Sequence, residues 1–158
     1  MRELATHVLA ACRRGGLKLA TAESCTGGMV AAALTDIAGS SDVLERGFVV
    51  YSNEAKTDML GVPEALIKRV GAVSEEVARA MAEGGLAHSD ADICVAITGI
   101  AGPGGGTPLK PVGLVHIACA RKGGATVHER HVFPGDRAAV RAASAIRALE
   151  LVQQCASG

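Results

Sequence analysis

Apolar residues recur every three or four positions in several parts of the chain, which is the spacing of helices with one buried face. The first such segment carries Leu4, Val8 and Ala11, and the glycines at 15 and 16 stop it. The second follows a pair of glycines and ends near Gly39. The pattern predicts helices over residues 3–14 and 29–34, and further helices that begin near Ser52, Pro63, Ser74 and Asp136.

Short runs of β-forming residues separate these helices and predict strands over residues 17–22, 47–51, 93–97, 113–121 and 126–133. The run 93–97 is apolar throughout, which is typical of a strand buried on both faces. The last two strands are joined through Gly123 and Gly124, which indicates a hairpin. Between residues 98 and 108, glycine and proline exclude regular structure and predict a long loop.

Alternation of helices and strands over a chain of this length predicts one α/β domain spanning residues 1–158. We expect a three-layer α/β/α arrangement with a mostly parallel, mixed sheet and an antiparallel hairpin at one edge. Binding sites in such sheets lie beyond the carboxyl ends of the strands. Residues 23–28, 52–56 and 98–106 each follow a predicted strand, so we expect them to meet at one rim of the sheet.

The composition of the chain argues against some classes of binding partner. Lys and Arg together number 16, as do Asp and Glu, so the formal net charge is zero, and the aromatic residues are one Tyr and two Phe. A neutral chain with so few aromatics lacks both the basic surface and the stacking platform of a nucleic-acid binder. No apolar run approaches the roughly 20 residues that span a bilayer. We expect a cytoplasmic protein that acts on a small molecule, with no nucleic acid and no membrane among its partners.

The five cysteines form no C-x-x-C pair, which favours reduced thiols in an intracellular protein. Cysteine and histidine also lack zinc-ligand spacing, and the two histidines of His128-x-x-His131 would point to opposite faces of a strand. We therefore predict no metal and no cofactor.

Two potential nucleophiles, Ser24 and Cys25, lie at the predicted turn from the first strand to the second helix. Backbone N–H groups at such a turn can bind a phosphate or a developing oxyanion, although Ser and Thr are also ordinary helix caps. A serine needs a base, and none of the five histidines is expected at this rim. Lys56 is expected there and can serve in a Ser-Lys pair, unless it is a solvated surface charge.

Two further segments can bind an anion. The glycine-rich loop over residues 99–106 could hold a phosphate through its backbone, or it could be a mobile surface loop. Arg137 and Arg141 lie one helical turn apart at the start of the last helix, where they could form a fork for a phosphate or carboxylate or belong to a solvated face.

Seven ordered blocks of the chain resemble the CinA C-terminal domain family, whose enzymatic members are nicotinamide-nucleotide amidases, also called NMN deamidases or PncC. The blocks are TAESCTGG at 21–28, DIAGSS at 36–41, RGFVVYSNEAK at 46–56, GAVS at 71–74, TGIAGP at 98–103, KPVG at 110–113 and FPGDR at 133–137. The resemblance covers nearly the whole chain. Some members carry this domain behind a larger N-terminal domain related to molybdopterin-binding proteins, so we expect this chain to be the stand-alone form.

The resemblance implies an α/β/α domain that hydrolyses nicotinamide mononucleotide (NMN) to nicotinate mononucleotide and ammonia in pyridine nucleotide recycling. It places the nucleophile on Ser24 and the base on Lys56. We also expect substrate-binding or oxyanion roles for ten residues of these blocks, and for Arg141 one helical turn after the last block: Cys25, Thr26, Gly27, Gly28, Tyr51, Asn53, Thr98, Gly99, Gly102, Arg137 and Arg141.

For Lys56 to act as a base, its pKa must fall well below the usual value of about 10.4, through burial or a nearby cation. We expect Arg137 or Arg141 to pack near the pair, either binding the substrate phosphate or lowering that pKa. Two alternatives stay open: Cys25 as the nucleophile of the same amidase, and a non-catalytic nucleotide-binding or protein-interaction module. The many small residues on the helices also favour a homo-oligomer.

Overall fold

The computed structural model covers residues 1–158 and shows a five-stranded sheet between two layers of helices. The helices are α1 Arg2–Arg14, α2 Met29–Thr35, α3 Asn53–Leu60, α4 Glu64–Val70, α5 Glu75–Ala87 and α6 Arg137–Ser157, with a short 3-10 turn at Ser40–Asp42. The strands are β1 Leu19–Glu23, β2 Leu44–Val49, β3 Ile93–Gly99, β4 Leu114–Arg121 and β5 Val127–Val132.

The strand order is β2-β1-β3-β4-β5. Strands β2, β1 and β3 run parallel, whereas β4 is antiparallel to both β3 and β5. The mixed sheet with a hairpin at one edge is therefore confirmed, but its parallel part is limited to three strands. The reason lies after β3, where a loop rather than a crossover helix connects to β4, so the chain returns alongside in the opposite direction.

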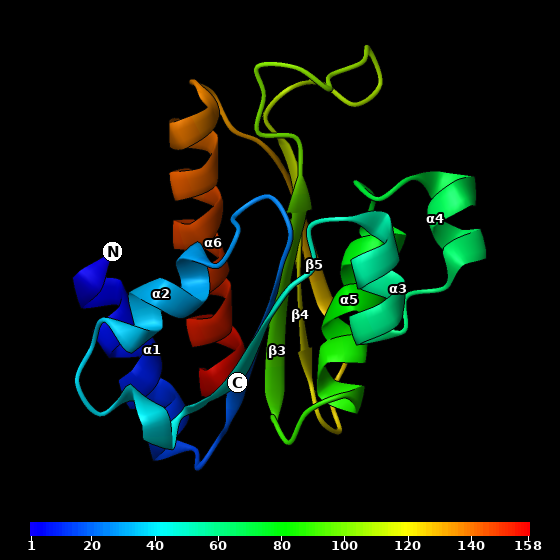
Figure 1. Ribbon diagram of the computed structural model, residues 1–158. Helices are drawn as coiled ribbons and strands as arrows, with labels where there is room; N and C mark the ends of the chain where they lie inside the picture. The colour runs from blue at the N-terminus through cyan, green and yellow to red at the C-terminus, as the bar shows by residue number, and fades with distance from the viewer.

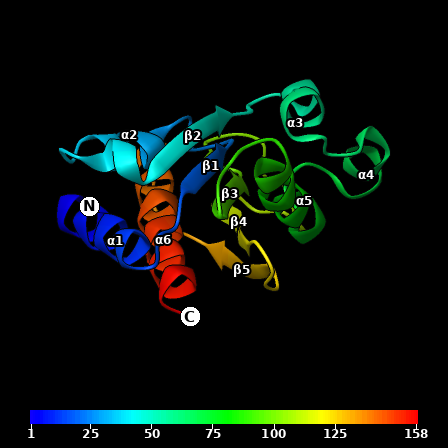
Figure 2. The same ribbon diagram turned by 90° about the horizontal axis from the view of Figure 1, so that it is seen from below.

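Helices cover both faces of the sheet, as the three-layer prediction requires. Figure 1 shows α1, α2 and α6 on one side and α3, α4 and α5 on the other, and Figure 2 shows the same two layers from below. Each layer encloses its own apolar cluster: one packs α1 and α6 against the sheet around Leu9, Ile117 and Leu149, and the other packs α5 around Met81 and Phe48.

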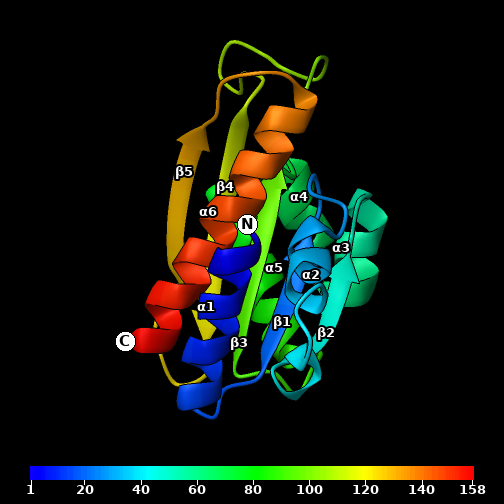
Figure 3. The ribbon, with the colours of Figure 1, turned by 90° about the vertical axis from the view of Figure 1, so that its left-hand side faces the viewer.

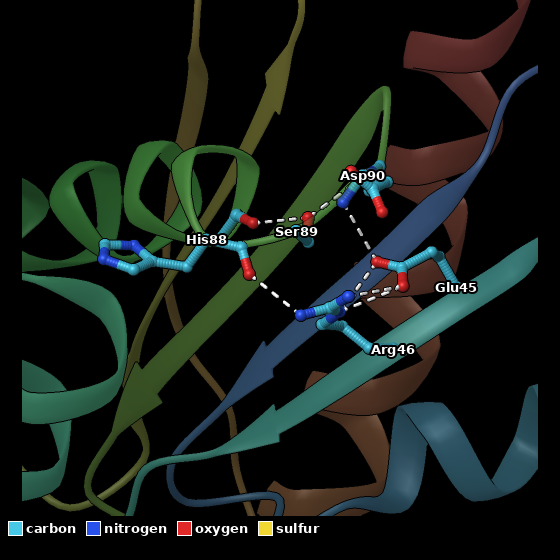
Figure 4. A network of polar contacts seen from close by, with 7 residues as sticks. Glu45, Arg46, His88, Ser89 and Asp90 are labelled. Atoms are coloured by element: carbon cyan, nitrogen blue, oxygen red, sulfur yellow. Dashed lines mark hydrogen bonds and ion pairs between the residues drawn. The ribbon is translucent and has the colours of Figure 1, made fainter.

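Polar groups lie at both ends of the sheet. At the amino ends of the parallel strands, the Arg46 guanidinium donates to His88 O at 3.1 Å and the Glu45 carboxylate accepts from Asp90 N at 3.1 Å, so this network fastens β2 to the α5–β3 connection (Figure 4). At the carboxyl ends, the chain leaves in the loops that precede α2, α3 and β4, and α6 begins at the same end (Figure 3). This carboxyl end is the one where a site was expected. No helix combines the length and the apolar character needed to cross a membrane.

Candidate active site

A cavity of about 190 Å³ opens where the turns after β1, β2 and β3 meet. The predicted convergence of these segments is confirmed. Most of the lining residues belong to segments that the sequence places there, but Ala72 and Val73 do not. The full lining is Ser24, Cys25, Tyr51, Asn53, Lys56, Ala72, Val73, Thr98, Gly99, Ala101 and Arg137.

The centre of the cavity is a buried contact between a hydroxyl and an amine. Lys56 Nζ lies 3.1 Å from Ser24 Oγ, and Lys56 is only 1% exposed. The amine also lies within hydrogen-bond distance of Val50 O (3.0 Å), Tyr51 O (3.1 Å) and Ser52 O (3.4 Å). Every oxygen around the amine therefore belongs to the backbone or to Ser24, and none to a carboxylate.

Local structure explains why Lys56 points inward. The Ser52 hydroxyl accepts a hydrogen bond from Ala55 N at 3.0 Å and so caps α3, which begins shortly after β2. Lys56 lies on the first turn of this helix, and its side chain reaches back to the carbonyls of the segment between β2 and α3. A lysine that looks like a surface residue in the sequence is thus the largest of the fully buried side chains.

Burial lowers the pKa of the Lys56 amine below its ordinary value, because the charged form loses its hydration. Negative charge on Cys25 or Glu54 would act in the opposite direction, with a smaller effect. Of the two mechanisms expected for a lowered pKa, the structure supports burial, and neither Arg137 nor Arg141 contributes to the shift.

The turn after Ser24 offers two backbone N–H groups without a protein acceptor, those of Cys25 and Thr26. The neighbouring amides are occupied, because Gly27 N donates to Ser24 O at 3.1 Å and Gly28 N donates to the Glu23 carboxylate at 3.3 Å. Of the amides of Cys25, Thr26 and Gly27, which were expected to bind an oxyanion, the structure leaves those of Cys25 and Thr26 without an acceptor.

Cys25 lines the cavity but is a poor candidate for the nucleophile. The residue is 6% exposed, and burial raises the pKa of its thiol to about 11, so the thiol stays protonated near neutral pH. Its Sγ packs against the backbone of Gly99, where an added Cβ would lie 3.2 Å from the sulfur.

The two arginines of α6 diverge instead of forming one fork. Arg137 lines the cavity, donates to Gly102 O at 2.8 Å, and lies 3.2 Å from the Tyr51 hydroxyl. Arg141 instead donates to Cys25 O at 3.0 Å and to Thr26 O at 3.2 Å. A second hollow, of about 530 Å³, adjoins the cavity and shares Ala101 and Arg137 with it. Arg137 therefore stands between the two hollows.

The remaining predicted residues divide between the cavity and its supports. Tyr51 is 63% exposed at the rim, and Asn53 lines the cavity. The Thr98 hydroxyl donates to Ala72 O at 2.9 Å, which ties the end of β3 to the segment before α5. Sequence reasoning missed this segment as lining, although it lies in the block at 71–74. No histidine lines the cavity, and no group of three potential metal ligands occurs in the structure.

Comparison with known proteins gives the family. The family model described as "CinA C-terminal domain" matches residues 1–156. The chain belongs to the CinA C-terminal domain family. A CinA-like protein of Akkermansia muciniphila is 58% identical to this CinA domain over 133 residues, which are 84% of this chain and 32% of that protein. The domain thus spans about a third of the length of the first curated relatives that it matches.

Relatives of the same size as this CinA domain also exist. A protein of Enterobacter agglomerans named nicotinamide-nucleotide amidohydrolase PncC is 47% identical over 150 residues, 95% of this chain and 92% of its own length. Among solved structures, the competence/damage inducible protein CihA of Agrobacterium tumefaciens superposes with a TM-score of 0.93 at 49% identity, covering 96% of this chain and 92% of its own. A CinA superfamily protein of Klebsiella pneumoniae gives 0.94 at 38% identity, covering 99% and 97%.

Proposed function

We propose that this CinA domain is a nicotinamide-nucleotide amidase that uses Ser24 as the nucleophile and Lys56 as the general base, in the recycling of pyridine nucleotides. The observation that carries the proposal is the buried 3.1 Å contact between Lys56 Nζ and Ser24 Oγ, in which no carboxylate holds the proton on the amine. The relative named nicotinamide-nucleotide amidohydrolase, which is similar over nearly its whole length, supports the choice of substrate.

The hydrogen bonds of a neutral lysine fit this arrangement. A neutral amine has two N–H groups and one lone pair. The N–H groups can donate to Val50 O and Tyr51 O, the two nearest carbonyls, which leaves the lone pair for the hydroxyl proton of Ser24. The uncharged amine gives up only its longest contact, the one to Ser52 O at 3.4 Å, and burial favours this uncharged form.

The reaction then proceeds in two stages. Ser24 Oγ attacks the carboxamide carbon as its proton moves to Lys56, and the amide N–H groups of Cys25 and Thr26 stabilise the oxyanion. Lys56 returns the proton to the nitrogen, ammonia leaves, and an ester joins the nicotinoyl group to Ser24. Lys56 then takes a proton from water, the hydroxide attacks the ester carbonyl, and Lys56 returns the proton to Ser24 Oγ as the carboxylate product leaves. Each such oxyanion donor is worth about 3 kcal/mol of transition-state stabilisation in known enzymes.

Arg137 is suited to the phosphate of the nucleotide. Its guanidinium lies at the border between the cavity around Ser24 and the larger hollow beside α6, where a ribose phosphate attached to the reacting ring would extend. Both arginines line the larger hollow, but only Arg137 also lines the cavity around Ser24, so we assign phosphate binding to Arg137.

The test is release of ammonia and nicotinate mononucleotide from NMN by the purified protein. We expect Ser24→Ala and Lys56→Met to lose this activity, and Cys25→Ala to retain it within a few-fold. The reverse result, with Cys25→Ala inactive, would transfer the nucleophile to the thiol. Binding of NMN without turnover by the wild-type protein would refute the amidase and favour the binding module.

A further inference from the structure

Glu23 is fully buried, and the proposed mechanism gives its carboxylate no role as nucleophile or base. One oxygen accepts hydrogen bonds from the Thr26 hydroxyl (2.6 Å), Val30 N (3.0 Å) and Gly28 N (3.3 Å), and the other accepts from Ala31 N at 3.1 Å. The carboxylate therefore occupies the amide end of α2, where its negative charge meets the positive end of the helix dipole.

Arg141 binds two backbone carbonyl groups of the same turn. Its fork bonds the oxygens of Cys25 and Thr26 from the side of α6. Arg141 Nη2 also lies so near Gly27 that a Cβ there would approach it to 3.3 Å. An anion inside the turn and a cation outside it thus fix the peptide groups that follow Ser24.

The backbone of Glu23 links this turn to the base. Glu23 O accepts from Val50 N at 2.9 Å, and Val50 O is the nearest of the carbonyls around Lys56 Nζ. A shift of the Glu23 peptide would therefore move the Ser24 hydroxyl and the surroundings of the amine together.

We propose that Glu23 and Arg141 are positioning residues: they take up the other polar groups of the turn, leaving the N–H groups of Cys25 and Thr26 free and aligned beside the Ser24 hydroxyl. The inference rests on the proposed role of Ser24 as nucleophile, but not on NMN as the substrate. Displacement of reacting groups by about 1 Å costs about 100-fold in rate, so loss of the carboxylate should reach that size.

The experiment measures the reactivity of Ser24 directly, with an alkyl phosphonofluoridate as the probe. The serine oxygen attacks phosphorus, fluoride leaves, and the hydroxyl proton passes to Lys56. Glu23→Gln preserves shape but replaces one acceptor oxygen with an amide NH₂ that faces backbone donors. We expect the second-order rate of labelling to fall about 100-fold in Glu23→Gln.

Arg141→Lys provides a second variant that does not depend on Glu23→Gln being folded. A lysine keeps the charge but cannot bond two carbonyls with a planar fork, so we expect a fall of about 10-fold. Glu129→Gln is the matched control, because Glu129 also pairs with an arginine of α6, Arg147, at 2.6 Å, yet lines no part of the cavity. Its labelling rate should equal that of the wild-type protein.

Two readouts separate positioning from a loss of folded protein. Labelling at long times should reach one probe per chain in each variant, while only the rate falls. The midpoint of the pH dependence of labelling should stay at its wild-type value, because the Glu23 charge is not among those that shift the pKa of Lys56. A variant that is merely unfolded would lower the final labelling instead.

The outcomes distinguish this inference from the proposed function. Labelling of Glu23→Gln and Arg141→Lys within threefold of wild type would overturn the positioning role, and so would a wild-type Ser24 that the probe does not label. Absence of NMN turnover together with rapid wild-type labelling would count against the substrate alone. Normal NMN turnover with unimpaired variants would count against the positioning role alone.

Discussion

Lys56→Met tests whether the buried amine is neutral in the native protein. Methionine has a similar length and removes the titrating group, so the comparison with wild type isolates the proton of Lys56. The unfolded chain binds that proton with the ordinary lysine pKa of 10.5, and burial makes the native protein bind it more weakly, with a lower pKa. Between the two pKa values the unfolded state holds more protons, so the stability of the wild-type protein rises with pH.

The magnitude follows from this difference in bound protons. Each pH unit within that window changes the free energy of unfolding by up to about 1.4 kcal/mol in favour of the wild-type protein. Methionine also leaves the carbonyls of Val50 and Tyr51 without their donor, at a cost of about 1–3 kcal/mol each, but this cost does not vary with pH. The difference in the free energy of unfolding between the two proteins is plotted against pH. Its slope reports the protonation of the Lys56 amine, whereas its pH-independent part reports the loss of the donor to the carbonyls.

The assay is urea denaturation of both proteins at intervals from pH 7 to pH 10. Groups that titrate in both proteins cancel in the difference between the two free energies of unfolding. As pH rises, the wild-type protein should become steadily more stable relative to Lys56→Met. Activity of the wild-type protein should increase over the same range in which Lys56 loses its proton. Parallel stability curves for the two proteins would show that Lys56 titrates normally and would refute the assignment of a neutral base.

Three other perturbations have defined outcomes. Arg137→Ala should raise the KM for NMN by about 10-fold or more while changing kcat less, because it removes a charged contact to the phosphate; steady-state kinetics, with the dephosphorylated nucleoside as comparison, would check this. Gly99→Ala should destabilise the fold by about 1–3 kcal/mol in urea denaturation, since its Cβ would lie 2.8 Å from Val115 Cγ2 and 2.9 Å from Leu114 O. In acid, Arg147 holds the pKa of the Glu129 carboxyl down to about 2, so the stability it contributes is present above pH 4.5 and lost as pH falls toward 2; Glu129→Gln should flatten that part of the acid-unfolding curve.

The location of the site could be predicted from the sequence because it follows from the order of strands and helices. Residues that follow parallel strands meet at one end of a sheet, so Ser24 and Lys56 could be brought together without coordinates. The direction of β4 was not predicted, although a loop with no crossover helix before it favours an antiparallel neighbour. The structure resolves the direction through hydrogen bonds such as Ile100 N to Leu114 O, which close the loop on itself.

The hydrogen-bond partners of the two arginines and of Glu23 could not be predicted from the local sequence pattern. Arg137 and Arg141 lie one turn apart and read as a single fork, yet the carbonyls of the turn after β1 engage only the second of them. The hydrogen bonds that the Glu23 carboxylate accepts from the amides of Gly28, Val30 and Ala31 depend on how the turn and α2 fold around it, which the sequence alone does not show. Burial of Lys56 likewise needed the fold, since α3 on its own presents it as an ordinary polar residue.

Main-chain oxygens, rather than acidic side chains, surround the amine of Lys56, and this has a consequence for how the family can diversify. Carbonyl oxygens persist whatever side chains the neighbouring positions carry. Substitutions at the outer positions Tyr51 and Asn53 can therefore reshape the mouth of the cavity while the oxygens around the Lys56 amine stay in place. In the proposed mechanism, such a scaffold could accept new amide substrates without a change in its base.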